Sequence, residues 1–347
     1  MSYQQAIPLV VLTGFLGSGK TTLLNAWLRD TRLRNCAVLL NEFGEIGLDH
    51  QLVEPMEGSP VLLANGCVCC SIREDLKTAI LNLEARRLAG DIPAFTRLVI
   101  ETTGVADPAP ILATLLNDPE LRHHYRLGTV VTVVDARHGP QDLRLREEAL
   151  KQAALADQFI ITKRDLVSPP ALAALEQQLR AINPGAQFAA PSDAGVLVNG
   201  DVYDPALRGE EVLRWLAPPT ATPLHAHGAP AATPHLQAFA SFALTLDQPL
   251  DWIAFGVWLT MLLHVHGNRV LRVKGILNVA GSPTPVVING VQHLVHPPFH
   301  LAAWPDADRR SRLVFITEGL SHETLGASLA AFNRLGARLR PAADFSP

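Results

Sequence analysis

Long apolar runs alternate with helix-like segments over roughly the first 190 residues of the chain. The runs are apolar throughout, which is typical of strands that are buried on both faces of a parallel sheet. The expected strands are residues 8–14, 36–43, 60–66, 97–104, 129–136 and 158–163, and the expected helices are residues 21–30, 74–89, 107–118, 146–156 and 169–182. This order predicts an α/β fold with a mainly parallel sheet flanked by helices, in which ligands collect at the carboxyl ends of the strands.

A second pattern begins after a stretch rich in Pro, Ala, Thr and His, APPTATPLHAHGAPAATP, which we interpret as a partly extended linker. Beyond it, the expected strands are residues 236–246, 270–280, 285–296 and 311–320, and the expected helices are residues 250–266 and 322–335. This order predicts a smaller C-terminal α+β domain with an antiparallel sheet. The predicted organisation is a first domain at residues 1–217, a linker at 218–235, a second domain at 236–336 and a tail at 337–347.

Composition and charge narrow the possible partners. The 347-residue chain is 48% hydrophobic and 18% charged, and its net charge is −4. These values argue against a nucleic acid or an anionic membrane surface as its partner. The N-terminal segment lacks the basic region and cleavage site of a signal peptide. The most apolar later stretch, WIAFGVWLTMLL, is well short of the ~20 residues that a membrane span needs. We therefore expect a cytoplasmic protein.

The segment GFLGSGKT at residues 14–21 matches the phosphate-binding pattern G-x-x-x-x-G-K-[ST], and it lies between an expected strand and an expected helix. In such a P-loop, backbone amides converge on phosphate oxygens at a helix N-terminus. Lys20 is expected to neutralise the β- and γ-phosphates, and the Thr21 hydroxyl is expected to hold Mg²⁺. The other expected nucleotide-binding residues of the loop are Gly14, Gly17, Ser18, Gly19 and Thr22. A chance glycine loop is the alternative, and the flanking strand and helix argue against it.

The segment VIETTG at residues 99–104 ends another apolar strand. Glu101 is a candidate to reach the metal or its water beside the phosphates, and Gly104 can offer its amide to the γ-phosphate. With Lys20, these two residues form the expected catalytic set. The same segment is also compatible with a helix start, since Asp107 followed by Pro108 is a favourable N-cap. Both interpretations can hold together.

The segment ITKRD at residues 161–165 follows the last expected strand of the first domain. Asp165 can accept hydrogen bonds from guanine N1–H and the guanine amino group, whereas adenine would oppose it with an acceptor. The stem of Lys163 can lie along the face of the base, and Thr162 belongs to the same motif. Its position on the sixth strand after a P-loop favours GTP over ATP. Asp135, which ends another strand, is interpreted as a helix or turn cap.

Cys67, Cys69 and Cys70 are three of the four cysteines, and they lie together in NGCVCCSIRED. The S-x-x-E capping box that follows them predicts a helix from Ile72. The positive end of that helix favours thiolates, which suit Zn²⁺, Cu⁺ or another thiophilic ion. An open three-sulfur site fits an ion that is handed on. One alternative is a closed structural zinc site that has a fourth ligand. The other is a redox pair, although vicinal cysteines form a strained disulfide. Cys36 is expected to be a small buried hydrophobe.

The motifs GFLGSGKTTLL, NEFGEIGLD, NGCVCC, VIETTGVADPAPI and TKRD, in this order, resemble the CobW family of P-loop GTPases. That family includes the YjiA-type proteins and is related to the UreG and HypB metal-insertion GTPases. The resemblance continues through LLHVHGNRVLRVKGIL, VVINGVQH and SRLVFI of the C-terminal part. It implies metal-dependent GTP hydrolysis and delivery of a transition metal, most often zinc and in some branches cobalt or iron, to client proteins.

The resemblance also implies roles for individual positions. It places NEFGE at residues 41–45 in a first switch, Glu101 with Gly104 in a second, and Lys163 with Asp165 at the guanine. Glu42 of the first switch is a candidate fourth ligand beside the cysteines. Many members carry a long histidine-rich linker, whereas this linker holds only three histidines, which argues against a metal reservoir there.

The sequence therefore predicts a GTP-hydrolysing metallochaperone that uses GTP, Mg²⁺ and Zn²⁺ or another thiophilic metal. Its expected partners are a guanine nucleotide and a client metalloprotein, with a homodimer as one possible assembly. One alternative is a metal sensor or store that nucleotide merely stabilises, and another is a cobalt- or iron-specific insertion factor. An ATP-dependent small-molecule kinase is a third alternative.

Overall fold

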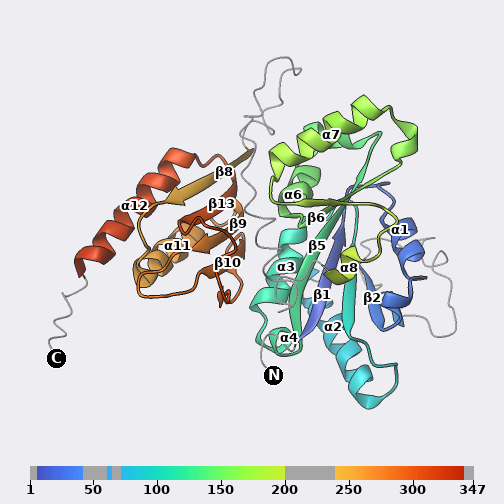
Figure 1. Cartoon of the computed structure of the whole chain (residues 1–347). Helices are drawn as coiled ribbons and strands as arrows, with labels where there is room; N and C mark the ends of the chain where they lie inside the picture. The colour runs from blue at the N-terminus through green and yellow to red at the C-terminus, as the bar shows by residue number, and fades with distance from the viewer. Residues whose placement is uncertain (1–5, 42–60, 65–71, 200–238, 340–347) are drawn as a thin grey trace.

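The structure is a computed structural model that describes residues 6–41, 61–64, 72–199 and 239–339 of the chain. These residues form two units, each built around its own sheet (Figure 1). The predicted linker, both of its borders and the end of the predicted tail lie outside the described residues. Within the described residues, no helix is both long and apolar enough to cross a membrane.

The N-terminal unit contains a seven-stranded sheet in the order β3-β2-β4-β1-β5-β6-β7, in which every neighbouring pair is parallel. The strands are β1 (Ile7–Thr13), β2 (Cys36–Asn41), β3 (Val61–Ala64), β4 (Arg97–Thr102), β5 (Tyr125–Asp135), β6 (Gln158–Thr162) and β7 (Gln187–Ala189). The predicted α/β fold with a parallel sheet is confirmed. Strand β7 was not predicted, because its three half-buried residues are too few to show a period.

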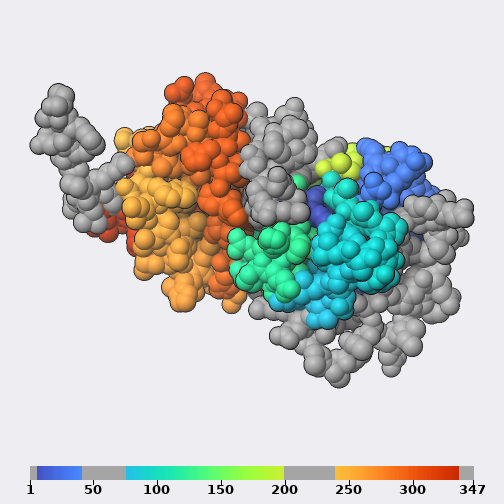
Figure 2. All heavy atoms as spheres, turned by 90° about the horizontal axis from the view of Figure 1, so that it is seen from below, coloured from blue at the N-terminus to red at the C-terminus, as the bar shows by residue number. Residues whose placement is uncertain are grey.

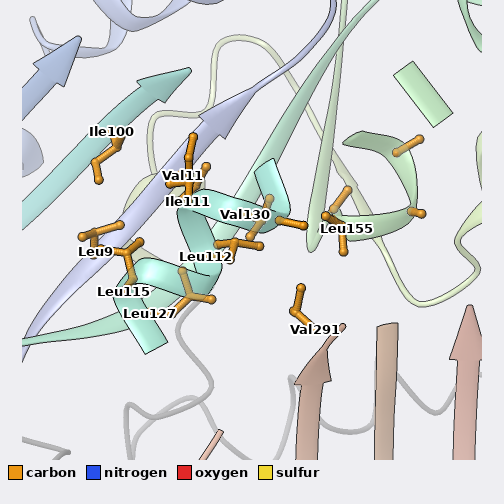
Figure 3. Packing of buried hydrophobic residues seen from close by; sticks show 14 of the residues in the cluster. Leu9, Val11, Ile100, Ile111, Leu112, Leu115, Leu127, Val130, Leu155 and Val291 are labelled. Carbon is orange, nitrogen blue, oxygen red and sulfur yellow. The ribbon is translucent and has the colours of Figure 1, made fainter. Parts of the chain in front are cut away.

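Helices cover both faces of this sheet. They are α1 (Lys20–Trp27), α2 (Ile72–Ala89), α3 (Pro108–Asn117), α4 (Pro119–His124), α5 (Gly139–Leu145), α6 (Glu147–Leu155), α7 (Pro169–Ile182) and α8 (Val196–Asn199), with short 3₁₀ turns η2 (Thr31–Leu33) and η4 (Arg164–Leu166). Successive residues of β1 point to opposite faces. Leu9 and Val11 pack in the core with α2, α3, α6 and α7 (Figure 3), whereas Val10 and Leu12 pack with α1 and α8.

The C-terminal unit contains an antiparallel sheet in the order β11-β10-β9-β13-β8, and β12 also pairs with β10. The strands are β8 (Phe239–Leu246), β9 (Val270–Leu277), β10 (Val286–Val291), β11 (Leu294–Val295), β12 (Phe299–His300) and β13 (Ser311–Glu318). Helix α11 (Trp252–His266) packs beside α12 (His322–Leu339), and Phe255 and Trp258 fill a separate core with Phe315. The predicted α+β domain with an antiparallel sheet is confirmed.

Helix α12 ends later than the sequence pattern predicted. It continues through Gly336 to Leu339, although the expected helix ended at residue 335 and the expected tail began at 337. A single glycine costs a helix only about 1 kcal/mol, which the packing of the preceding turns can offset. The described part of α12 therefore extends through the first three residues of the expected tail.

The two units lie against each other (Figure 2). Apolar and charged side chains form the contact between them. Val291 of β10 belongs to the same buried cluster as Leu155 at the end of α6 (Figure 3). Immediately after α6, Asp157 accepts hydrogen bonds from Arg272 and from Lys274 Nζ, the latter at 2.6 Å, and both cations lie on β9. The Arg272 guanidinium also donates to the Leu155 carbonyl oxygen at 3.0 Å. A buried ion cluster therefore joins the first sheet to the second unit.

Candidate nucleotide site

The P-loop connects β1 to α1 at the carboxyl edge of the sheet. Gly14 adopts φ +145°, and a Cβ atom placed there would lie 2.2 Å from the carbonyl oxygen of Val133 on β5. Only glycine fits that position, because the clash would be with backbone. The loop is closed by a hydrogen bond from Ser18 N to Phe15 O at 3.1 Å. The loop therefore lies directly against β5 and opens onto the N-terminus of α1, where backbone amides favour an anion.

Lys20, the first residue of α1, is buried and turned back into its own loop. Its Nζ donates to the carbonyl oxygen of Gly14 at 2.8 Å. Burial lowers the pKa of Lys20, and the negative charge of Glu101 partly offsets that effect. The ammonium group thus lies inside the loop whose amides are expected to receive the phosphates, and phosphate oxygens would compete with the Gly14 carbonyl for it.

Thr21 and Glu101, the two predicted Mg²⁺ ligands, are brought together. The Thr21 hydroxyl donates to Glu101 Oε1 at 2.6 Å. Glu101 is buried near the end of β4, where the parallel register pairs it with Leu12 of β1. Hydroxyl and carboxylate oxygens are donors that Mg²⁺ accepts, and a magnesium ion usually takes one or two such protein ligands together with water and phosphate oxygens. This donor pair fits Mg²⁺.

The segment after β4 packs against the P-loop. A Cβ atom at Gly104 would lie 2.6 Å from both N and Cα of Leu16, so this position also requires glycine. The amide group of Gln152 on α6 holds the segment by donating to the carbonyl oxygens of Gly104 at 3.2 Å and Ala106 at 3.0 Å. Asp107 caps α3 by accepting from Ala109 N at 2.9 Å, as its position before a proline predicted.

Gln152 was missed by the sequence reasoning. It lies on the amphipathic helix α6 among charged residues, where a glutamine is usually exposed, yet it is 1% exposed. A buried amide side chain is held by specific hydrogen bonds. Nothing in the linear pattern indicated that its partners are in residues 104–106.

The ITKRD segment also reaches the P-loop. Strand β6 ends at Thr162, whose hydroxyl donates to the Ser18 carbonyl oxygen at 2.7 Å. Lys163 follows in a left-handed conformation with φ 53°, and its Nζ donates to the Gly17 carbonyl oxygen at 2.7 Å. Asp165 is exposed on η4. Two side chains therefore attach this segment to the loop and leave the Asp165 carboxylate facing solvent.

Asp135 at the end of β5 has more contacts than the capping role predicted for it. It does cap the following turn, since Oδ1 accepts from Arg137 N at 2.7 Å and His138 N at 3.2 Å. Its Oδ2 is 2.7 Å from Lys163 Nζ and 3.0 Å from His138 Nδ1. Burial raises the pKa of Asp135, but these hydrogen bonds outweigh that effect and lower it to about 2.

The predicted metal ligands Cys67, Cys69, Cys70 and Glu42 lie outside the described residues. Searched by themselves, the described residues contain no cluster of three or more His, Cys, Asp or Glu side chains that could hold a metal. Cys36 is buried as predicted, and burial raises the pKa of its thiol to about 12, which makes it a poor ligand.

The described strands show where the two undescribed segments join the sheet. Strand β2 ends at Asn41 and β3 ends at Ala64, and the two strands are parallel neighbours in which Leu40 pairs with Ala64. On its other side β2 pairs with β4, where Leu40 is opposite Glu101. Helix α2 begins at Ile72, as the capping box predicted. Residues 42 and 65 therefore follow their strands at the same carboxyl edge as the P-loop, whereas residue 60 precedes β3 at the opposite edge.

A seven-stranded parallel sheet flanked by helices, with a lysine-bearing glycine loop after its first strand, defines a P-loop nucleotide-binding protein. Residues 8–190 match the family model described as CobW/HypB/UreG, nucleotide-binding domain, and residues 239–333 match the cobalamin synthesis protein cobW C-terminal domain. The chain belongs to the CobW family, and the resemblance found in its motifs is confirmed.

Two curated relatives are similar over most of their length, and a third is similar over less than half of its own. The zinc chaperone YjiA of Escherichia coli is 32% identical over 94% of this chain and 99% of its own. The zinc chaperone CobW of Pseudomonas aeruginosa is 30% identical over 93% of this chain and 90% of its own. The zinc-regulated GTPase metalloprotein activator 1 of Schizosaccharomyces pombe is 36% identical over 51% of this chain and 44% of its own.

The fold is also similar to a solved structure. The crystal structure of the Zn(II)-bound YjiA GTPase from Escherichia coli superposes with a TM-score of 0.70 at 28% identity, and the match covers 94% of this chain and 99% of that one. Coverage of this extent includes both sheets, so the two-unit architecture is shared along with the nucleotide-binding fold.

Proposed function

We propose that this chain is a GTP-hydrolysing metallochaperone that binds a transition metal, zinc by analogy with its named relatives, and hands it to a client metalloprotein. The observation that supports the nucleotide part is the convergence of three segments on the P-loop. Glu101 reaches it through Thr21, Gly104 packs against Leu16, and Lys163 bonds Gly17. Chaperone and GTPase names among the relatives support the metal part.

In this proposal each side chain has a defined task. Lys20 exchanges the Gly14 carbonyl for β- and γ-phosphate oxygens. Thr21 and Glu101 hold Mg²⁺, which when bound supplies positive charge to the phosphate oxygens. The Gly104 amide faces the γ-phosphate, and Asp165 accepts from the N1–H and amino groups of guanine. Backbone dipoles and cations fixed before the reaction are what lower the barrier to phosphoryl transfer.

The metal would bind as cargo to the thiolates of Cys67, Cys69 and Cys70, with Glu42 as the candidate fourth ligand. Support comes from β2 and β3, which end at the same carboxyl edge of the sheet as Glu101 and lie one and two strands away from its strand β4. A change at the γ-phosphate can thereby alter the geometry of the thiolates, and by reciprocity metal binding must alter nucleotide affinity to the same degree. A cytoplasmic site of action remains our prediction.

Base preference tests the nucleotide assignment. Asp165→Ala removes an acceptor for two hydrogen bonds from guanine, so GTP affinity should fall at least about tenfold while ATP affinity stays unchanged. Glu176→Gln is the matched control, because this carboxylate lies near the same segment, 3.7 Å from Arg164, and has no assigned contact with nucleotide. Equal GTP affinity in the Asp165 variant and the parent would contradict guanine recognition and favour an ATP-dependent enzyme.

Zinc affinity tests the metal assignment. Zinc content and zinc affinity should fall in Cys67→Ser and stay unchanged in Cys36→Ala, since Cys36 is buried and protonated. Affinity should also differ between the protein loaded with GDP and with a non-hydrolysable GTP analogue. Equal affinities in the two nucleotide states would contradict the coupling. GTP turnover that zinc does not change would instead favour the sensor or store.

A further inference from the structure

Asp135 lies at a junction between two neighbouring strands of the candidate nucleotide site. In the parallel register of β5 and β6, Asp135 pairs with Thr162, so its side chain is next to the residue that follows, Lys163. The carboxylate is 5% exposed and the lysine side chain is 37% exposed. The buried carboxylate of Asp135 thus holds the ammonium group of Lys163, whose side chain remains partly exposed to solvent.

The Lys163 ammonium is held from two directions. It is 2.7 Å from Asp135 Oδ2 and 2.7 Å from the Gly17 carbonyl oxygen. Gly17 belongs to the loop and Asp135 to β5, so the two acceptors fix the ammonium with respect to both. Lys163 is also the N-terminal cap residue of η4, which carries Asp165. A shift of the Lys163 backbone would therefore also move Asp165, two residues further along the chain.

We propose that Asp135 is a positioning residue for base recognition: it holds Lys163 as one wall of the guanine pocket and thereby sets the affinity for the base. The proposal rests on the proposed guanine-binding role of Lys163 and Asp165. It assigns to Asp135 a task beyond capping, because a cap needs only an acceptor for the amides of Arg137 and His138, whereas the lysine needs the negative charge.

The two tasks can be separated by substitution. Asparagine keeps an oxygen at Oδ1 for the two amides, but it replaces Oδ2 with an NH₂ group that cannot accept from the ammonium. Asp135→Asn should therefore preserve the turn and release Lys163. Asp135→Ser is the second variant, since its hydroxyl can still accept from the amides without a charge. If one of these two variants folds poorly, the other can still be used to test the role of Asp135.

The experiment measures GTP turnover and nucleotide affinity in Asp135→Asn. The KM for GTP and the dissociation constant for GDP should rise about tenfold or more, as expected when a charge-assisted hydrogen bond is lost, while kcat at saturating GTP stays unchanged. Binding of inorganic pyrophosphate, a probe without a base, should also stay unchanged. Asp142→Asn is the control, because this neighbouring carboxylate of α5 has no assigned contact with Lys163.

A double-mutant cycle with Lys163→Met completes the test. If Asp135 acts through the lysine, the substitution Asp135→Asn should have no further effect on KM once Lys163 is methionine. Effects that multiply, or an unchanged KM in Asp135→Asn while Lys163→Met raises it, would overturn the positioning role and leave the guanine site intact. If Lys163→Met and Asp165→Ala both leave GTP binding unchanged, the proposed guanine site itself is wrong and the role of Asp135 is refuted with it.

Discussion

Asp157→Asn is the substitution that most directly tests how the two units are held together. The carboxylate accepts from Arg272 and Lys274 of the C-terminal sheet, and its other oxygen accepts from Val130 N of β5 at 2.9 Å. Burial raises the pKa of Asp157, but the charges of the two cations and these hydrogen bonds outweigh burial, so its pKa is lowered. The Asp157 carboxylate is therefore ionised at neutral pH, and its negative charge compensates the buried charges of Arg272 and Lys274.

The expected cost follows from the burial of the cations. The Arg272 side chain is 3% exposed and that of Lys274 is 7% exposed, so neither can regain its hydration when the negative charge is removed. Breaking a buried ion pair by removing one partner typically costs about 3–5 kcal/mol. Arg272 keeps its hydrogen bond to the Leu155 carbonyl oxygen, which places the expected loss near the lower end, at about 3 kcal/mol. For a 347-residue chain that unfolds as one unit, a loss of that size corresponds to a fall in Tm of roughly 4 °C.

Differential scanning calorimetry of the full chain measures this loss. Asp306→Asn is the matched control, because it removes the carboxylate of a more exposed pair with Arg312 at 2.7 Å, which should cost at most about 1 kcal/mol. Adding Arg272→Met and Lys274→Met to Asp157→Asn should recover most of the stability, since apolar side chains replace the unpaired cations. A fall in Tm for Asp157→Asn no larger than that of the control would refute the reasoning.

Three further outcomes follow from the site. Gly104→Ala should lower GTP turnover at least about tenfold, because the new Cβ would displace the backbone of Leu16 in the P-loop, and steady-state kinetics would detect the change. Thr21→Ala should raise the Mg²⁺ concentration needed for half-maximal turnover, since Glu101 would lose its partner at 2.6 Å; an unchanged magnesium titration would contradict the assignment. The lowered pKa of Asp135, about 2, stabilises the fold above the unfolded value near 4, by up to about 2 kcal/mol, and this contribution is lost as the pH falls from about 4 to 2. Urea unfolding of Asp135→Asn and the parent should therefore give free energies that differ at pH 7 and converge near pH 2.

The sequence was sufficient to predict the parts of the fold that depend on local pattern. Uninterrupted apolar runs mark strands that are buried on both faces, and all six predicted strands of the first sheet are present. The start of α3 followed from Asp107 before a proline, and the start of α2 from a capping box. These signals are contained in a few neighbouring residues, so no knowledge of the tertiary arrangement was needed.

The contacts that organise the site could not be predicted, because they depend on strand order. Asp135 and Lys163 are 28 residues apart, and they meet only because β5 and β6 are neighbours in the sheet. Gln152 belongs to a helix whose polar residues resemble a solvated surface, and only the packing of α6 on the segment after β4 explains its burial. Asp157 and Arg272 are 115 residues apart and belong to different units. A linear pattern contains no information of this kind.

The position of the ion cluster also bears on how the protein is made. The first sheet is complete once Ala189 has been synthesised, whereas Arg272 and Lys274 follow roughly 80 residues later. At about 5–20 residues per second, the ribosome therefore leaves a delay of roughly 4–16 s in which Asp157 and the end of α6 have no C-terminal unit against them. During that delay, water must solvate a carboxylate that is later enclosed. The nucleotide site can thus form on the nascent chain before the interface does, and a ligand that binds it early would hold β6 in place for the second unit to dock.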